Sequence, residues 1–301
     1  LFEELENTLK QGEVNAQTVE QAFTKYLDRF AELAKLKYVD AYYGHIVGAN
    51  KTESNQLFLV ARTETQPYKY YYLIRNQDTT WSEWQEMDVT ISAETVTLVH
   101  AFNRLFVFWV EQKKFDKNNG NESAKKATKA AIKYSFYNFS GKWVQPQTLA
   151  DEIIINVEGS AYQKKYESLL PGSLFAPNEI AWQKVYPLTI QKDQFWVPGA
   201  GANSFEKVIL LYGPMLDLEA SPALSKVDAP DRSDETTQQF ESELYQTLRY
   251  FSQAKSLSYD GLLPLHKPIV INDDLQVGFL ANPNEFLLFA KDSDQSTPQV
   301  R

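Results

Sequence analysis

Apolar positions in the first forty residues recur at helical spacing. Leu1, Leu5 and Leu9 fall one turn apart, which predicts a first helix. Asn15 can cap a second helix, whose apolar positions run through residues 19–33. Each helix then carries one apolar stripe. Such a stripe needs a surface to cover, so the two helices either pack on the following domain or belong to a larger helical domain upstream.

From residue 39 onward the period changes to that of strands. Segments rich in Tyr, Phe, Val, Ile and Trp alternate with polar turns, which predicts an antiparallel sheet built mostly from short hairpins. The predicted strands cover residues 41–48, 56–64, 68–75, 94–101, 104–112, 131–139, 179–190, 194–197 and 208–212. After a linker over 216–234, an amphipathic helix and final strands are predicted. The fold class is therefore mainly β with α-helical additions at both ends.

Composition narrows the function more than the fold. The chain has 301 residues, 43% of them hydrophobic and 23% charged, which is a globular composition. Its formal net charge of -9 opposes binding to nucleic acid. No cysteine is present, so disulfides and thiolate chemistry are excluded. The sequence opens with Leu1 and has no recognisable signal peptide, and we interpret it as an interior fragment of a longer chain.

A lysine-rich segment over residues 113–129 interrupts the strands and is predicted to be a long exposed loop. It has almost no apolar residue, and Phe115 alone interleaves with its lysines, so a nucleic-acid patch is not favoured. Its lysines are Lys113, Lys114, Lys117, Lys125, Lys126 and Lys129. In an otherwise acidic chain, they are candidates for an electrostatic latch at an interface.

Two segments of the β region echo each other. Residues 70–84 (YYYLIRNQDTTWSEW) and 133–146 (KYSFYNFSGKWVQP) each hold an aromatic strand, a polar turn and a Trp, namely Trp81 or Trp143. Both resemble a worn form of the Asp-box hairpin of sialidase-type propellers. A propeller or a related antiparallel array is therefore one expectation for the β domain.

A longer pattern is more specific. The order YYGHIVGANKTESNQLFLVARTETQPYKYYYLIR, WSEWQEM, NRLFVFWVEQ and YSFYNFSGKWVQP resembles the neuraminidase-like region of the A component of bacterial insecticidal toxin complexes (Tc toxins). The preceding VEQAFTKYLDRFAELAKLKYVDAYYG resembles the helical segment that leads into that region. The resemblance covers residues 1–160 well. It implies a helical lead-in at 1–37, a neuraminidase-like β domain of propeller-like or sandwich kind at 38–215, and a linker, helix and strands at 216–301.

The resemblance also implies a function. Tc toxin A components are pore-forming pentamers that bind a host cell surface receptor or glycan and translocate a toxic enzyme delivered by the B and C components. Their neuraminidase-like region is part of an outer shell that opens when pH changes. The implied protein is secreted or on the bacterial cell surface, acts on the host membrane and is not an enzyme.

A sialidase-type hydrolase or glycan-binding module is the alternative. Sialidases hold a carboxylate with three arginines, and the strand-rich first half of the chain contains three, Arg62, Arg75 and Arg104. Strand-end arginines of a shell domain explain the same pattern without catalysis. No cofactor is expected, and the spacing of the three histidines does not indicate a metal site.

The aromatic residues between 68 and 87 allow two interpretations. Most of them are expected to fill the two faces of a packed sheet. The alternative is an exposed aromatic platform for glycan, with Tyr70, Tyr72, Trp81 and Trp84 as its candidates.

Overall fold

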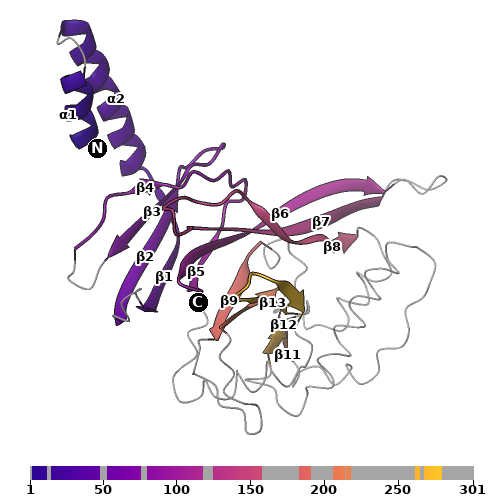
Figure 1. Cartoon of the computed structure of the whole chain (residues 1–301). Helices are drawn as coiled ribbons and strands as arrows, with labels where there is room; N and C mark the ends of the chain where they lie inside the picture. The colour runs from indigo at the N-terminus through magenta and orange to yellow at the C-terminus, as the bar shows by residue number, and fades with distance from the viewer. Residues whose placement is uncertain are drawn as a thin grey trace, which may run out of the picture. The chain divides into compact units, whose positions relative to one another are not determined.

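The computed structural model describes residues 2–11, 15–47, 53–75, 80–117, 125–157, 183–190, 206–213, 215–217, 262–264 and 268–279. These residues form two helices and antiparallel sheets, so the predicted mainly β class is confirmed (Figure 1). The chain divides into two compact units, Leu1–Glu94 and Thr95–Arg301. This division does not follow the boundaries expected at residues 38 and 216, which stay a prediction.

Helices α1 (Phe2–Gln11) and α2 (Ala16–Ala34) form the hairpin that the apolar spacing predicts. Asn15 caps α2: its side chain accepts a hydrogen bond from the Thr18 N–H, and the Thr18 hydroxyl accepts one from the Asn15 N–H. This capping box satisfies N–H groups that the first turn cannot pair. Much of the apolar stripe of α2 is open, with three of its side chains about half exposed. They are Phe23, Leu27 and Phe30, exposed by 46%, 58% and 54%.

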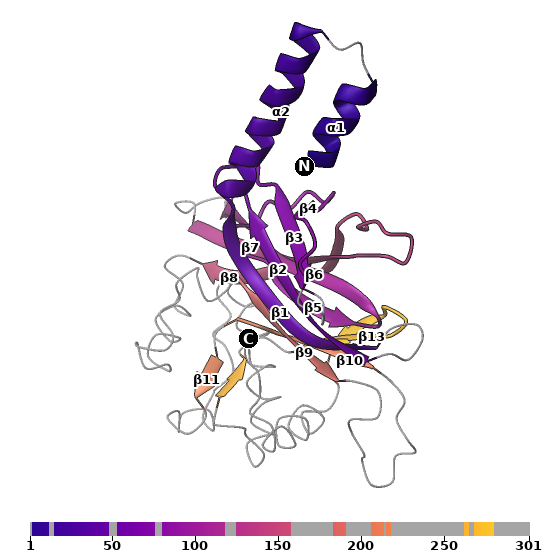
Figure 2. The same cartoon turned by 90° about the vertical axis from the view of Figure 1, so that its left-hand side faces the viewer.

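The first sheet follows the helices directly. It contains β1 (Lys37–Val47), β2 (Glu53–Arg62), β3 (Tyr70–Arg75) and β4 (Gln85–Glu86), paired antiparallel in that order (Figure 2). Tyr70, Tyr71 and Tyr72 are all at least 96% buried although they alternate between the faces. Both faces of β3 are therefore covered, as the aromatic alternation predicts.

The second sheet is the core of the other unit. Its order is β5 (Thr97–Ala101), β6 (Arg104–Lys117), β7 (Lys125–Phe136) and β8 (Gln147–Val157). Strands β5 and β6 meet in a two-residue turn in which Phe102 and Asn103 have φ of 51° and 56°. Positive φ at both positions is typical of a type I′ hairpin, which suits the twist of the strands. Below the turn, Phe106 stacks with Phe108 in the buried core.

The predicted loop over residues 113–129 is wrong at both ends. Strand β6 continues to Lys117 and β7 begins at Lys125, with a register unbroken from Phe106↔Phe136 to Lys117↔Lys125. The strands persist with few apolar residues because the backbone ladder continues through this segment. Ion pairs lie within it and beside it. Lys133 binds Glu111 at 2.7 Å and Lys129 binds Glu152. Only residues 118–124 of the predicted loop lie outside the described residues.

A third sheet has the order β14 (Val277–Phe279), β13 (Ile269–Asn272), β10 (Lys207–Tyr212) and β9 (Val185–Ile190). Strands β11 (Met215–Asp217) and β12 (Leu262–Pro264) form a separate pair. The predicted C-terminal helix and the predicted strand at 194–197 lie outside the described residues.

Candidate functional site

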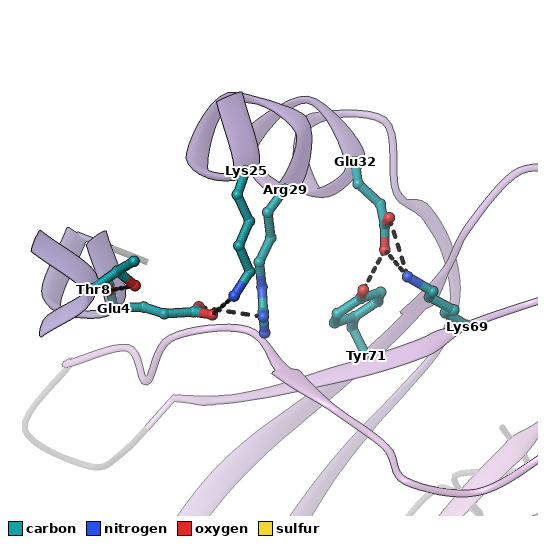
Figure 3. A network of polar contacts seen from close by, with 7 residues as sticks. All are labelled: Glu4, Thr8, Lys25, Arg29, Glu32, Lys69 and Tyr71. Atoms are coloured by element: carbon teal, nitrogen blue, oxygen red, sulfur yellow. Dashed lines mark hydrogen bonds and ion pairs between the residues drawn. The ribbon is translucent and has the colours of Figure 1, made fainter. Parts of the chain in front are cut away.

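A network of charged side chains joins the helical hairpin to the first sheet (Figure 3). The Glu32 carboxylate, near the end of α2, accepts a hydrogen bond from the Tyr71 hydroxyl of β3. It also accepts bonds of 3.3 Å from the Lys69 ammonium, just before β3. Two donors from the sheet thus converge on one helical carboxylate. We call Glu32, Lys69 and Tyr71 the helix–sheet joint.

The electrostatics of the joint favour an ionised carboxylate. Burial alone would raise the pKa of Glu32, but the hydrogen bonds from Tyr71 and Lys69 outweigh it and hold this pKa below its ordinary value. Burial, and next the bond to Glu32, raise the pKa of the Tyr71 hydroxyl. Tyr71 therefore stays a protonated donor and Glu32 a charged acceptor at neutral pH.

A second cluster holds the helices to each other. Glu4 of α1 binds the Lys25 ammonium at 3.0 Å and the Arg29 guanidinium at 3.3 Å, both on α2. The bond from Lys25 contributes most to lowering the pKa of Glu4. One group of paired charges thus joins the two helices to each other, and the helix–sheet joint connects α2 to the first sheet.

Arg62, the first of the three candidate arginines, is buried and fully engaged. Its Nε donates to the Glu94 carbonyl at 2.9 Å and its Nη1 to the Thr63 carbonyl at 2.8 Å. Its guanidinium lies 4.1 Å from the centroid of the Tyr68 ring. The side chain is 5% exposed. Its hydrogen bonds connect the loop after β2 to the segment before β5.

The strand register separates Arg62 from Arg75. Arg62 pairs with Tyr70 and Arg75 with Leu57, so the two arginines are five positions apart along the strands, about 16 Å. Because side chains alternate, five residues also place the two arginines on opposite faces of the sheet. They do not converge on one ligand. The structure therefore does not assemble the three-arginine site of the sialidase alternative.

Arg104 lies at the start of β6 in the other unit. Its guanidinium is 5.1 Å from the Phe136 ring centroid and 4.6 Å from that of Phe139, which is 71% exposed. Its Nε is buried and makes no hydrogen bond to a described residue. Arg104 thus packs as a flat side chain between two rings at a hairpin end.

The candidate aromatic platform is divided between core and surface. Tyr70 and Tyr72 are buried, and their hydroxyls donate to the Ala93 carbonyl at 2.5 Å and to the Gln85 side chain. These two rings are core, which corrects their place in an exposed platform. Trp81 is 49% exposed, and the Arg75 guanidinium lies 5.5 Å from its ring centroid.

Trp84, the fourth candidate of the platform, is half-buried. Its ring packs against Tyr38 at 5.9 Å with a tilt of 52°. Tyr38 thus covers part of the Trp84 ring, and Trp81 is the most exposed of the four candidate rings.

The candidate latch lysines lie on strands rather than in a loop. Lys113 and Lys114 are exposed on β6. Lys129 on β7 is paired with Glu152 and also lies 5.0 Å from the Phe115 ring centroid. The side chains of Lys117, Lys125 and Lys126 lie outside the described residues.

The two echoing hairpins have a common backbone feature. Arg75 forms an isolated antiparallel bridge with Trp81, and Tyr137 forms one with Trp143. In the second hairpin the Asn138 carboxamide oxygen accepts bonds from the N–H groups of Ser140 and Lys142, both at 3.0 Å. A polar side chain thus holds the turn before Trp143. The sequence alone shows this repeat, whereas no motif marks the residues of the helix–sheet joint.

The described part of the chain contains no group of three His, Asp or Glu placed to hold a metal ion. Among the same residues, no helix is both long and apolar enough to span a membrane. His100 on β5 is partly buried, and this burial lowers its pKa to about 4. It is therefore uncharged at neutral pH.

Comparison with known proteins places this arrangement in a family. The sequence model of the neuraminidase-like domain matches residues 36–186, half of the chain. The chain belongs to the neuraminidase-like domain family. Its first sheet and the whole of β5 to β8 lie within the matched range. The family predicted from the motifs is confirmed.

Individual known proteins are similar to this chain. Toxin subunit YenA2 of Yersinia entomophaga is 28% identical over 169 residues, which cover 51% of this neuraminidase-like chain and 12% of that protein. The cryo-EM structure of Morganella morganii TcdA4 matches 94% of the chain with a TM-score of 0.50 at 15% identity, and supports the fold. That of Yersinia pseudotuberculosis TcaA-TcaB matches 53% with a TM-score of 0.36 and 18% identity. The chain spans 12% or less of the length of each of these relatives.

Proposed function

We propose that this neuraminidase-like chain is a shell region of a Tc toxin A subunit. In this role it helps to assemble a pentamer, binds no cofactor and opens in response to pH before a toxic enzyme is translocated. The observation that carries the proposal is the match to a toxin subunit over 169 residues within a neuraminidase-like domain. The B and C components and a host cell surface receptor or glycan are its proposed partners.

Structural side chains support a scaffold rather than a hydrolase. Arg62 donates to main-chain carbonyls and is buried, so it is not presented to a substrate carboxylate. Arg75 lies at the other end and on the other face of the same sheet. A sialidase needs arginine forks converging on one carboxylate. Here the arginines bind main-chain carbonyls and pack on aromatic rings, which suits a rigid shell domain.

The paired helices support the same role. The helix–sheet joint fixes α2 against the sheet, while Glu4 holds α1 to α2. In a shell, such a joint transmits a displacement of helices to the β domain. The lysines of β6 and β7 remain candidates for a latch, because Lys113 and Lys114 are exposed on an otherwise acidic chain.

Negative-stain electron microscopy of the full-length subunit at neutral pH tests the proposal. A five-fold bell-shaped particle is the expected result, and monomers or irregular particles would contradict it. Replacing Lys113 and Lys114 by glutamine then tests the latch, since it removes two exposed charges of β6 without changing the length of the hairpin. An unchanged pH of pore formation would remove these lysines from the opening mechanism.

An assay with a fluorogenic sialoside tests the enzymatic alternative. No turnover is expected from the folded chain. Turnover that disappears in Arg62→Ala would contradict the scaffold proposal, provided that circular dichroism shows the variant to be folded.

A further inference from the structure

Three hydrogen bonds join the β5 segment of the second sheet to the third sheet, within the second unit. Two of them run from threonine hydroxyls to main-chain carbonyls at or just before β9, and the buried one joins Thr97 to Val185 at 3.0 Å. The third runs from the Phe102 N–H to the Glu206 carboxylate at 2.7 Å. Hydroxyls and carbonyls do not titrate near neutral pH, so the third bond is the one that responds to acid directly.

The Phe102 N–H needs an acceptor from outside its own hairpin. Phe102 is the first residue of the two-residue turn between β5 and β6, and its φ is 51°. The hydrogen bond that closes such a turn uses the N–H of the fourth residue, not that of the second. Because Phe102 is only 9% exposed, an unpaired N–H here would cost free energy. Glu206 supplies the acceptor and thereby joins the turn to the start of β10.

The Glu206 carboxylate also lies beside a second one. Glu206 directly precedes β10, whose first residue, Lys207, pairs with Asn272 at the end of β13. The next position along these antiparallel strands places Glu206 opposite Asp273. The Asn272 side chain fixes the turn that contains Asp273, because it accepts a hydrogen bond from the Gln276 N–H at 2.8 Å. Two like charges at opposite positions destabilise the pair of strands.

The surroundings of Glu206 favour its neutral form. Burial is the largest influence and raises the pKa of the carboxyl group, the bond from Phe102 opposes it, and the charge of Asp273 raises the pKa further. The net pKa lies above the ordinary value of 4.5. Glu206 is half-buried and Asp273 is exposed, so the first proton that the two carboxylates take up belongs on Glu206.

Other charged or titratable side chains lie on the elements around the two carboxylates. They are His100 on β5, Arg104 on β6, Lys184 before β9, Lys207 on β10 and Asp274 in the β13–β14 turn. The Arg104 guanidinium packs on the rings of Phe136 and Phe139. Among the described residues, Asp273 is the charged group that shifts the pKa of Glu206. The two carboxylates therefore form the titrating unit.

We propose that Glu206 and Asp273 form an acid-operated clamp between the second and third sheets. When the pair binds one proton, one oxygen of Glu206 still accepts the Phe102 N–H, and the new O–H donates to the Asp273 carboxylate. A hydrogen bond then replaces the repulsion between the ends of β10 and β13. When the proton is lost, both carboxylates are charged and the contact weakens. Acid therefore strengthens the junction that holds the β5–β6 turn.

The clamp opposes the acid sensitivity of His100. A group whose pKa is raised on folding contributes stability that is complete below its unfolded value, here 4.5, and that is lost as pH rises through the folded value. Burial lowers the pKa of His100, which has the opposite effect in the same unit. In the proposed shell function, on which this consequence rests, the clamp keeps the second unit intact while a pH change breaks contacts between subunits.

Hydrogen exchange at the Phe102 N–H of the full chain tests the clamp. Protection, corrected for the intrinsic pH dependence of exchange, is expected to rise as pH falls from about 7 to about 4.5, by about tenfold for each unit by which folding raises the pKa of Glu206. Asp273→Asn removes the repulsion, so it should raise protection at neutral pH and reduce the pH dependence. Asp274→Asn, at the next exposed acid of the same turn, is the matched control and should keep the original profile. Equal profiles for the two variants would overturn the proposal.

Thr97→Val separates the clamp from the other bonds of the junction. It removes a hydrogen bond whose donor and acceptor do not titrate, so it should lower protection of β5 by the same factor at both pH values. A pH dependence lost in Thr97→Val but kept in Asp273→Asn would overturn the assignment to the carboxylates.

Carboxyl carbon NMR gives an independent readout of the proton. One glutamate signal is expected to titrate above 4.5, to be absent in Glu206→Gln and to move to lower pH in Asp273→Asn. A Glu206 signal that Asp273→Asn leaves unmoved would overturn the clamp. These measurements concern one unit of a single chain, so their failure would leave the proposed shell function standing. Conversely, the absence of a five-fold particle would leave the clamp standing.

Discussion

The Tyr71 hydroxyl of β3 donates its hydrogen bond to the Glu32 carboxylate of α2, across 39 residues of sequence. Tyr71 is 1% exposed, so its hydroxyl depends on this acceptor. Lys69 provides the only other donor that the described residues direct to Glu32. One helical carboxylate therefore satisfies a buried phenol and balances an ammonium group at the same time.

Removing either member of this pair is expected to loosen the helical hairpin. A hydrogen bond to a charged group contributes roughly 1.5–3 kcal/mol, so Glu32→Ala and Tyr71→Phe should each lower the free energy of unfolding by about that amount. In a double-mutant cycle measured by urea unfolding, the two losses should not add. Glu20→Ala, at an exposed position of the same helix, is the control, and a loss as large as that of Glu32→Ala would contradict the prediction.

The joint also predicts how the first unit responds to acid. The folded state lowers the pKa of Glu32, so its contribution is present above the ordinary value of 4.5 and is lost as pH falls below it. Glu32→Gln should therefore remove part of the acid sensitivity of hydrogen exchange at α2 below about pH 4.5. Equal pH profiles for the two proteins would show that the carboxylate is not the sensitive group.

His100 is expected to destabilise the second unit at mildly acidic pH. Burial lowers its pKa from 6.5 to about 4, so the unfolded chain binds a proton that the folded chain does not. Stability should fall as pH drops from 6.5 toward 4, by roughly 3 kcal/mol in total. Glu206 acts in the opposite sense, because burial raises its pKa and folding then favours the protonated form. Urea unfolding of His100→Gln across this range should show a smaller loss than the unmodified chain.

The pattern of apolar residues predicts the apolar strands of the β domain better than it predicts the strands in its charged segments. Continuous apolar runs located β3 and β6, because burial on two faces selects rings and branched side chains at successive positions. The lysine segment has few such residues and therefore predicts a loop, yet its two strands pair in an unbroken ladder and Lys129 binds Glu152. Cross-strand charge pairing leaves no periodic apolar signal.

The candidate site shows the same limit. Arg62 was identifiable by residue type, but only the strand register shows that it is separated from Arg75. Glu32 has no motif at all: it is one acid in an amphipathic helix, and its role depends on a strand 39 residues away. Local sequence specifies elements and caps, while a joint between elements depends on three-dimensional placement.

Arg62 is expected to be a structural arginine, which a lysine cannot replace. Lysine is a point charge and cannot reproduce the bonds of the guanidinium fork to the Glu94 and Thr63 carbonyls. Arg62→Lys should lower the free energy of unfolding by about 2–3 kcal/mol because these buried acceptors lose their donor. Arg75→Lys, at an exposed position, should change it by less than about 0.5 kcal/mol. Thermal denaturation of both variants checks the contrast, and equal losses would contradict it.

The β5–β6 turn offers a test in which packing is unchanged. Asn103 is exposed and holds a φ of 56°, a conformation that asparagine tolerates, glycine adopts freely and alanine disfavours by roughly 1–2 kcal/mol. Asn103→Ala should therefore destabilise the second unit by about 1 kcal/mol, while Asn103→Gly should leave it unchanged or slightly more stable. Phe102 has a similar φ but is 9% exposed and packs on Phe106, so Phe102→Gly should lose more through its ring than it gains in the backbone. Urea unfolding of the three variants separates the two effects. If Asn103→Ala were as stable as Asn103→Gly, the left-handed conformation would not govern this turn.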